Sequence, residues 1–331
     1  MIKIIQDTNG TMTLDDLREY KAIVRETVGI EYRGFNVYTT PTPTSGSVCL
    51  SVLKTMEQYP LSDAHDTNLT VHRFNEAMRF AYGARMELGD PCYVSNMAPY
   101  EDRLLSTSRA QHIRRRILDD ATQPVGAYDP RGEYSAPGHG TSHVVTADAL
   151  GMVVTSTTTI NTLFGAQIMT PRSGIILNNE MDDFSIPGKT NDFGFPPAAA
   201  NFIRPGKRPL SSITPVIAEF PNGTFAFATG AAGGSRIISA TVQVAWDVLE
   251  HGMSAADAIA APRLHDQLIP DRVQLEYTFD NGTAASLAEK GHNVTWVRLG
   301  ISVVHGIRRN WDGTFEAASE PRQKSSAGLT T

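Results

Sequence analysis

The chain has 331 residues, of which 41% are hydrophobic and 19% are charged, and its formal net charge is −6. This length suits one large globular domain or two of roughly 150 residues each, and the acidic balance argues against nucleic acid or an anionic membrane as a partner. No segment approaches the roughly 18 apolar residues of a membrane span, and residues 1–30 lack the basic and apolar regions of a signal peptide. The sequence therefore gives no cellular location.

The first part of the chain, residues 1–140, is predicted to be mainly helical. Apolar spacing and capping residues predict helices over residues 13–20, 47–59, 68–88 and about 101–120, with one strand over residues 31–39. The basic run His112–Arg116 is expected to be a solvated helix face. Three prolines and four glycines in residues 121–140 then predict a flexible connector.

After the connector the pattern changes to strands, as runs of β-branched and aromatic residues between turn residues indicate. A hairpin is predicted from residues 143–148 and 152–160. Further strands are expected over residues 174–179, 214–220 and 224–230 and near Val273, Val294 and Val303, with helices over residues 236–250 and 254–261. By itself this succession indicates a mixed α/β domain.

Thr141, in the run Gly140-Thr141-Ser142-His143, opens the predicted hairpin. A threonine hydroxyl is a weak nucleophile, and one way to activate it is to make the same residue's free α-amino group the general base. That amine exists only if the Gly140–Thr141 bond is broken, and attack of the hydroxyl on its own preceding carbonyl would break it. Gly140 suits this step because glycine adopts backbone angles that other residues cannot. A Gly-Thr-Ser run taken alone is far more often a turn than an active site.

Four blocks in the second half favour the catalytic interpretation. They are TSHVVTADALGMVVTSTTTINTLFG from residue 141, SGIILNNEMDDFS from 173, RPLSS from 208 and GAAGGSRI from 230. In this order and spacing they resemble the small subunit of the γ-glutamyltransferases, also called glutathione hydrolases, and the resemblance runs from about Thr11 to Leu329. It implies an α+β fold, the four-layer αββα sandwich of the N-terminal-nucleophile hydrolases. Residues 1–140 would correspond to the end of the large subunit and residues 141–331 to the small subunit, interwoven in one domain.

The strand over residues 156–161 and the acidic turn that follows it carry several of the implied site residues. Alternation along a strand places Thr159 and Asn161 on one face. The resemblance implies that Thr159 hydrogen-bonds the nucleophile and that Asn161 contacts the α-amino-acid end of the substrate. Glu180 and Asp183 are expected to accept charge-assisted hydrogen bonds from the ammonium of the substrate.

Two further pairs complete the implied site. The resemblance assigns binding of the substrate α-carboxylate to Ser211 and Ser212, and the backbone amides of Gly233 and Gly234 would form the oxyanion hole, since an absent side chain lets the backbone approach developing negative charge. The glycine loop fits neither a dinucleotide fingerprint nor a P-loop. The acidic turn, in which Asp182 is expected to be structural, lacks the spacing of an EF-hand loop, so we expect neither a cofactor nor a metal.

The implied reaction is acyl transfer in two steps. Thr141 would attack the γ-carbonyl of glutathione or another γ-glutamyl compound, release the amine and keep a γ-glutamyl ester on its oxygen. Water, an amino acid or a dipeptide would then accept the acyl group, and the two cleaved pieces would stay assembled. Two alternatives stay open: a glutaryl-type acylase of the same fold, which would not need the ammonium-binding pair, and an inactive relative that serves as a binding or scaffold protein.

Members of this family carry a large block of chain before the position that matches Met1. That block normally supplies secretion or anchoring signals, part of the sandwich and an arginine for the substrate α-carboxylate. We therefore expect the sandwich to be incomplete on its N-terminal side and residues 1–331 alone to have little activity.

Cysteines and sequons add weaker indications. Cys49 and Cys92 are expected to be core residues. Together with the family resemblance, the sequons favour an extracellular, cell-surface or vacuolar location. They begin at Asn9, Asn68, Asn222, Asn281 and Asn293.

Overall fold

The computed structural model describes residues 1–131, 140–188, 197–300 and 302–330 of the chain. Its centre is a six-stranded antiparallel sheet in the order β1-β2-β5-β6-β10-β11. The strands are β1 (Val28–Tyr32), β2 (Phe35–Thr39), β5 (Val216–Glu219), β6 (Phe225–Ala232), β10 (Val303–Arg309) and β11 (Phe315–Ala318). Every residue of β6 is buried, which agrees with its uninterrupted run of small and apolar residues.

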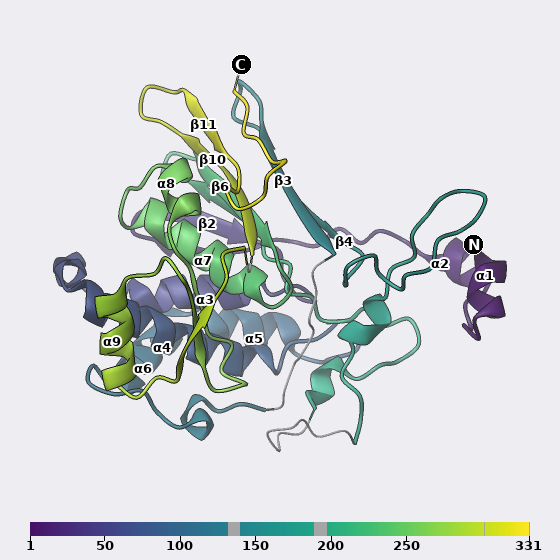
Figure 1. Cartoon of the computed structure of the whole chain (residues 1–331), viewed down its shortest axis with the longest axis horizontal. Helices are drawn as coiled ribbons and strands as arrows, with labels where there is room; N and C mark the ends of the chain where they lie inside the picture. Colours follow the sequence, from purple (N-terminus) through teal and green to yellow (C-terminus); the bar gives the residue numbers. More distant parts are fainter. Residues whose placement is uncertain (132–139, 189–196, 301, 331) are drawn as a thin grey trace.

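A layer of helices covers one face of this sheet (Figure 1). It contains α3 (Gly46–Met56), α4 (Thr67–Arg85), α5 (Met97–Leu104), α6 (Thr107–Arg116) and α7 (Arg236–Leu249). All residues of α3 except Lys54 are buried, because this helix is enclosed by α4, α7 and the sheet. The main hydrophobic core therefore lies between the sheet and these helices.

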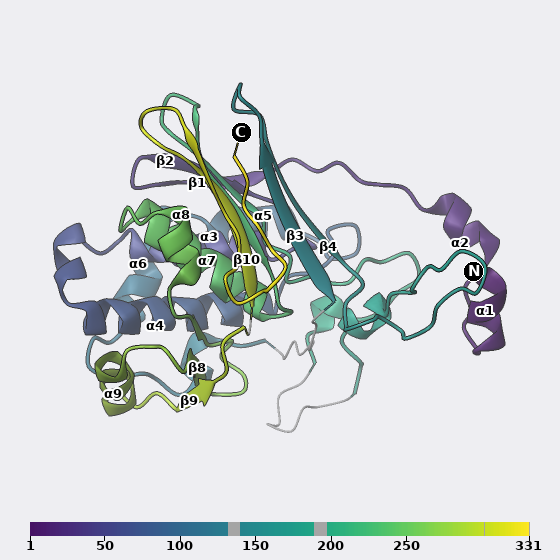
Figure 2. The same cartoon turned by 45° about the horizontal axis from the view of Figure 1, so that its top comes forward.

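The opposite face of the sheet carries a hairpin of β3 (Thr141–Ala147) and β4 (Val153–Thr159), which packs against β6 and β10 (Figures 1 and 2). Side chains along β4 alternate between half-buried and exposed, and on the outer face Val144 and Val154 are 55% and 57% exposed. Among the residues that the structure describes, no helix covers this outer face. The α+β class is confirmed, and the described chain forms three layers of the expected sandwich: helices, sheet and hairpin.

A smaller sheet with the order β7-β8-β9 lies beside the helices. It consists of β7 (Leu264–His265), β8 (Val273–Glu276) and β9 (Val294–Val297), with α9 (Asn281–Glu289) as the crossover between the parallel strands β8 and β9. Helix α9 was not predicted from the sequence, because it begins with Asn-Gly-Thr, which is typical of a turn. Asp280 caps it by accepting a hydrogen bond from the Thr283 amide. The predicted helix α8 (Ala255–Ala260) is confirmed.

Three predicted elements differ in the structure. The strand predicted over residues 31–39 is the β1–β2 hairpin, because Arg33 and Gly34 both have positive φ, as a two-residue type I′ turn requires. The helix predicted over residues 101–120 is divided into α5 and α6, because Ser106 accepts a hydrogen bond from the Arg109 amide and starts a new helix. Residues 174–179 form no strand and contribute to an isolated bridge only.

The predicted connector is in part an ordered and packed segment. Residues 121–131 include the 3₁₀ helix η2 (Val125–Tyr128), and the buried Tyr128 hydroxyl lies 2.7 Å from the Glu76 carboxylate of α4. The prediction of flexibility is therefore wrong for this half. Residues 132–139 of the connector lie outside the described residues. The remaining 3₁₀ helices are η1 (Leu61–His65), η3 (Glu180–Asp183) and η4 (Ala199–Asn201).

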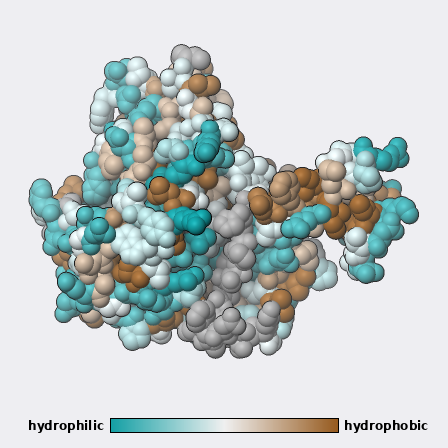
Figure 3. All heavy atoms as spheres, in the orientation of Figure 1, coloured by the Kyte–Doolittle hydropathy of each residue, from teal (hydrophilic) through white to brown (hydrophobic). Residues whose placement is uncertain are grey.

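The N-terminal segment forms an arm that extends away from the body of the molecule (Figure 2). It carries α1 (Ile2–Asp7) and α2 (Leu14–Glu19), neither of which has a buried residue. Thr13 caps α2, as predicted. Tyr20 and Val24 are 72% and 97% exposed, and Figure 3 shows hydrophobic residues gathered over the arm. The arm contributes nothing to the described core.

Of the remaining predictions on single residues, some are confirmed and one is wrong. Cys49 is buried in α3, as predicted, but Cys92 is exposed, so the prediction of a core position is wrong for it; both are free thiols. The run His112–Arg116 is a mostly exposed face of α6, as predicted.

Candidate active site

Thr141 and Thr159 face each other where β3 begins and β4 ends. The two residues are direct partners in the hairpin ladder, and their Oγ1 atoms lie 2.9 Å apart. Thr159 Oγ1 also accepts a hydrogen bond from the Asn161 amide at 2.8 Å. Because the Thr159 oxygen accepts from that amide, its hydroxyl orientation is restricted, and the strand ends place a second hydroxyl beside the candidate nucleophile.

The Gly140 carbonyl is held beside both hydroxyls in the uncut chain. Its oxygen accepts a hydrogen bond from the Ile160 amide at 3.0 Å and lies 3.4 Å from Thr159 Oγ1, while the Gly140 amide donates to the Asn161 oxygen at 2.7 Å. Gly140 does not have positive φ, so our conformational reason for a glycine here is wrong. The reason is space: a Cβ atom would overlap the Thr162 carbonyl oxygen and lie 3.1 Å from the Asn161 oxygen.

A cavity of about 230 Å³ brings Thr141 and Gly233 together. Gly233 and Gly234 lie between β6 and α7 with φ values of 139° and 63°, which favour glycine. Within the described part of the chain, neither amide donates to another backbone group. Free amides at the N-terminus of a helix attract negative charge. The other residues lining the cavity are Ser142, His143, Ala232, Gly300, Ser302, Val303, His305 and Gln323.

Asn179 connects the end of β4 to the acidic turn. The Asn161 side-chain amide donates to the Asn179 carbonyl at 3.1 Å, and Asn179 Oδ1 accepts from the Thr162 amide at 3.0 Å. Asn161 itself has φ 72° and is buried. These bonds fix the start of η3, and hence Glu180, relative to the strand that carries Thr159.

Glu180 and Asp183 face each other across the single turn of η3. Asp183 is 7% exposed and Glu180 is half-buried. Burial and the neighbouring Asp183 carboxylate raise the pKa of Glu180 above its usual range. Ionising both carboxyl groups is thus unfavourable, and a bound cation would lower that cost. Asp182 is exposed and accepts a hydrogen bond from the Asn179 side chain at 2.7 Å, which agrees with a structural role.

Asn201 connects the acidic turn to the serine pair. This fully buried side chain donates to the Asp183 carbonyl at 2.6 Å and accepts from the Leu210 amide at 2.9 Å, directly before Ser211. Ser212 is buried, and its hydroxyl oxygen accepts a hydrogen bond from Arg85 of α4 at 3.1 Å. Asn179, Asn201 and Arg85 were not found in the sequence, since nothing near them in the chain indicates these partners.

His143 is a buried neighbour of the candidate nucleophile that no sequence motif indicated. Its Nδ1 lies 2.8 Å from Thr157 Oγ1 and its Nε2 3.1 Å from Thr155 Oγ1, and burial followed by the nearby His305 lowers its pKa to about 4. Strand alternation places His143 on the same face as Thr141, so the period of two could have found it.

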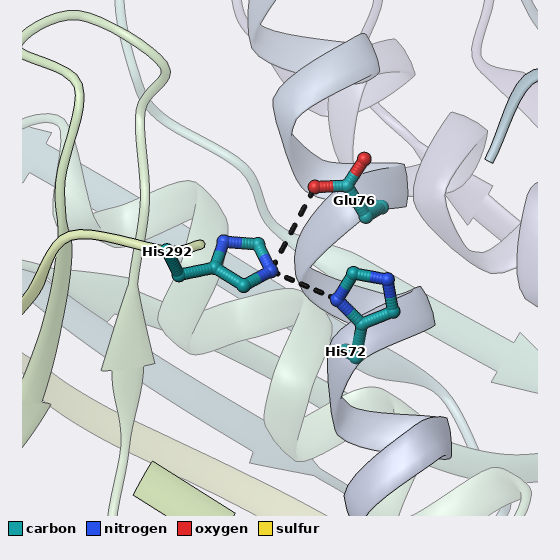
Figure 4. Close-up of side chains that lie close together, drawn as sticks. All are labelled: His72, Glu76 and His292. Atoms are coloured by element: carbon teal, nitrogen blue, oxygen red, sulfur yellow. Dashed lines mark hydrogen bonds and ion pairs between the residues drawn. The ribbon is translucent and has the colours of Figure 1, made fainter. Parts of the chain in front are cut away.

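One group of described residues has nitrogen and oxygen atoms close enough to hold a metal ion: His72, Glu76 and His292 (Figure 4). Hydrogen bonds account for this arrangement. His72 Nε2 donates to the Leu118 carbonyl at 2.7 Å, which leaves Nδ1 to accept from His292 Nε2 at 2.8 Å. The His292 Nδ1 then accepts from the Asn75 amide at 3.3 Å. One hydrogen thus occupies the space between the rings, and the absence of a metal stays a prediction.

No helix in the described ranges is both long and apolar enough to cross a membrane. A family model described as "Gamma-glutamyltranspeptidase" matches residues 1–330. The chain is 47% identical over 330 residues to the "Glutathione hydrolase proenzyme" of Arthroderma benhamiae and 43% identical over 331 residues to the "Glutathione hydrolase" of Aspergillus flavus. Each alignment covers 99% of this chain and 56% of the relative. The chain thus spans about half the length of these relatives.

Solved structures give the same grouping. The cephalosporin acylase from Bacillus halodurans superposes with a TM-score of 0.80 at 26% identity, covering 96% of this chain and 55% of that one. A mutant γ-glutamyltranspeptidase from Helicobacter pylori superposes with a TM-score of 0.51 at 35% identity, covering 55% of this chain and 100% of that one. The fold is therefore that of the N-terminal-nucleophile hydrolases, and the chain belongs to the γ-glutamyltranspeptidase family.

Proposed function

We propose that Thr141 is an N-terminal nucleophile that transfers γ-glutamyl groups from glutathione and related compounds to water, amino acids or dipeptides. The observation that carries this proposal is the Thr141–Thr159 hydroxyl pair, whose oxygens lie 2.9 Å apart; Thr141 also lines the cavity that Gly233 lines. A nucleophile, a hydroxyl that orients it and unused backbone amides are the parts that acyl transfer requires.

The first reaction is self-cleavage. Thr141 Oγ1 attacks the Gly140 carbonyl carbon, the C–N bond breaks, and the nitrogen takes up a proton to become the free α-amine. Water then hydrolyses the resulting ester, which leaves Gly140 as a carboxylate and restores the Thr141 hydroxyl. The Ile160 amide and Thr159 hydroxyl near the Gly140 oxygen support this step, since they stabilise the negative charge that develops there.

Turnover repeats the same chemistry on a bound substrate. The Thr141 amine accepts the hydroxyl proton as the oxygen attacks the γ-carbonyl, and it returns a proton to the departing amine. The γ-glutamyl ester that remains is then cleaved by water or by the amine of an acceptor. Amides of Gly233 and Gly234 would stabilise the oxyanion of each tetrahedral intermediate. This chemistry needs no cofactor.

The acidic pair favours a γ-glutamyl over a glutaryl substrate. A glutaryl group has the same terminal carboxylate but no ammonium, so it offers no charge-assisted hydrogen bond to Glu180 and Asp183. A cephalosporin acylase superposes with a TM-score of 0.80, so the fold alone does not decide between the two substrates. We therefore assign the ammonium to Glu180 and Asp183, the α-carboxylate to Ser211 and Ser212, and a substrate contact to Asn161.

The test is direct. Mass spectrometry of the folded wild-type protein should find a fragment that begins Thr-Ser-His, and Thr141→Ala should abolish it. The cleaved protein, in the complete natural polypeptide that contains residues 1–331, should release p-nitroaniline from γ-glutamyl-p-nitroanilide much faster than from glutaryl-p-nitroanilide. A glutaryl preference would establish the acylase alternative. A folded protein that neither cleaves itself nor turns over either anilide would indicate a binding or scaffold protein.

We also propose that the protein follows the secretory route. The asparagines of all five sequons are exposed, as acceptors of a bulky glycan must be. Treatment of the natively expressed protein with a peptide N-glycosidase should lower its mass. An unchanged mass would remove this support for an extracellular, cell-surface or vacuolar location.

A further inference from the structure

The serine pair is attached to α4 by one buried guanidinium. Arg85, in the last turn of α4, is 2% exposed. Its Nη2 donates to Ser212 Oγ at 3.1 Å and its Nε donates to Ser45 Oγ at 2.8 Å. Ser45 Oγ in turn donates to the Ser211 carbonyl at 2.7 Å. One side chain therefore reaches both members of the pair, Ser212 directly and Ser211 through Ser45.

The same loops are joined by their backbones. The Ser211 amide donates to the Pro43 carbonyl at 2.8 Å, and the Ser45 amide donates to the Ile213 carbonyl at 3.1 Å. Arg85 thus completes a small hydrogen-bonded unit made of residues 43–45, residues 211–213 and the end of α4. Arg85, Ser45 and Ser212 are buried, where a hydrogen bond is electrostatically stronger than in water.

The direction of the bond to Ser212 decides what its hydroxyl can do. A guanidinium has donors and no acceptor, so Ser212 Oγ must accept from Arg85, and its own hydrogen points elsewhere. The structure records no acceptor for that hydrogen among the described residues. A hydroxyl that accepts from a cation is also a stronger donor, because each bond of a hydrogen-bonded chain polarises the next.

We infer that Arg85 is a positioning residue for carboxylate recognition, because it fixes Ser212 with the hydroxyl hydrogen directed at the substrate α-carboxylate. This inference rests on the proposed function, in which the serine pair binds that carboxylate. Arg85 acts through the serine and does not itself contact the substrate. Its loss should therefore weaken binding of substrates that carry the carboxylate and leave the reacting atoms in place.

Three anilides separate this role from a general structural one. γ-Glutamyl-p-nitroanilide carries both the ammonium and the carboxylate, glutaryl-p-nitroanilide carries the carboxylate alone, and 4-aminobutyryl-p-nitroanilide carries the ammonium alone. For Arg85→Met in the complete natural polypeptide we expect kcat/KM to fall about 10- to 100-fold on the first two, mainly through KM, and less than about threefold on the third. Arg85→Lys, which keeps a cationic donor, should recover part of the loss.

Self-cleavage at Gly140 provides the measure of folding, because it involves no substrate carboxylate. Arg33→Met is the matched control: Arg33 bonds Glu250 and the Tyr59 carbonyl, away from the serine pair, and its loss should not distinguish the three anilides. Ser212→Ala should reproduce the substrate pattern, and the Arg85→Met/Ser212→Ala double variant should lose no more than the worse single variant.

An equal loss on all three anilides, or additive losses in the double variant, would overturn the inference. If Arg85→Met does not cleave itself, the comparison of Arg85→Lys with wild type on the three anilides decides in the same way. A wild-type protein that does not turn over γ-glutamyl-p-nitroanilide would instead refute the proposed function. The two failures are therefore distinguishable.

Discussion

Gly140→Ala is predicted to slow self-cleavage without preventing folding. The new methyl group would overlap the Thr162 carbonyl oxygen and lie 2.9 Å from the Thr162 carbonyl carbon and 3.1 Å from the Asn161 oxygen. All three atoms belong to backbone, so they cannot rotate away, and the chain at residue 140 must move by about 1 Å. A displacement of that size at a reacting centre costs on the order of 100-fold in rate.

The assay is a time course of the fragment that begins at Thr141, followed by mass spectrometry after rapid purification or refolding. Gly126→Ala is the matched control, since a Cβ atom there has no neighbour within 4 Å and Gly126 does not have positive φ. It should cleave at the wild-type rate. If Gly140→Ala shows a wild-type thermal midpoint and also cleaves as fast as wild type, then close packing at Gly140 does not position the carbonyl and the reasoning is refuted.

Three further outcomes are expected. Asp183→Ala should lower kcat/KM on γ-glutamyl-p-nitroanilide by about 30- to several-thousand-fold, because losing one partner of a desolvated charge pair costs ~2 to 5 kcal/mol. Self-cleavage should persist in this variant. Equal activity of variant and wild type would favour the acylase alternative. Burial first, and then His72, lower the pKa of His292 to about 3 from the 6.5 of an unperturbed histidine, so its contribution to stability is present above pH 6.5 and is lost as the pH falls. Urea unfolding of His292→Gln between pH 7 and pH 4 should therefore show a shallower loss of stability than wild type, by up to about 1.4 kcal/mol per pH unit, and parallel curves would contradict the neutral, buried state. Burial raises the pKa of Asp247 to about 7, above its unfolded value of 3.8, so the free-energy cost of burying the ionised carboxylate appears as the pH rises. Asp247→Asn should therefore be more stable than wild type at pH 8 but not at pH 4, as measured by the same unfolding curves.

The sequence predicted elements where local pattern and burial agree. Runs of β-branched residues predicted the β3–β4 hairpin, and the apolar spacing of α3 and α4 located both helices to within a few residues. Local signals failed where one residue changed the direction of the chain. Arg33 in a turn and Ser106 as a cap are each compatible with a continuous element until the backbone angles are known.

The candidate site was predictable only in part for a different reason. The candidate nucleophile, the acidic pair and the glycine loop each lie in a short motif. The groups that hold them in place come from distant segments. Asn201 bridges η3 and Leu210, and Arg85 reaches Ser212 across 127 positions of the chain. No periodicity relates such pairs, because tertiary packing of separate elements brings them together.

In the proposed self-cleavage, the strand ladder at Thr141 makes the uncut chain its own first substrate. Before cleavage, the carbonyl next to the Thr141 hydroxyl is that of Gly140, and the Ile160 amide holds it there. In the proposed reaction an incoming carbonyl would take that same place, so the uncut backbone would keep other substrates out. Thr141 is paired with Thr159 in the hairpin, and cleavage would leave that pairing intact while separating Gly140 from Thr141. A single bond cleavage would thus create the proposed catalytic amine and also release the group that occupies the position it would serve.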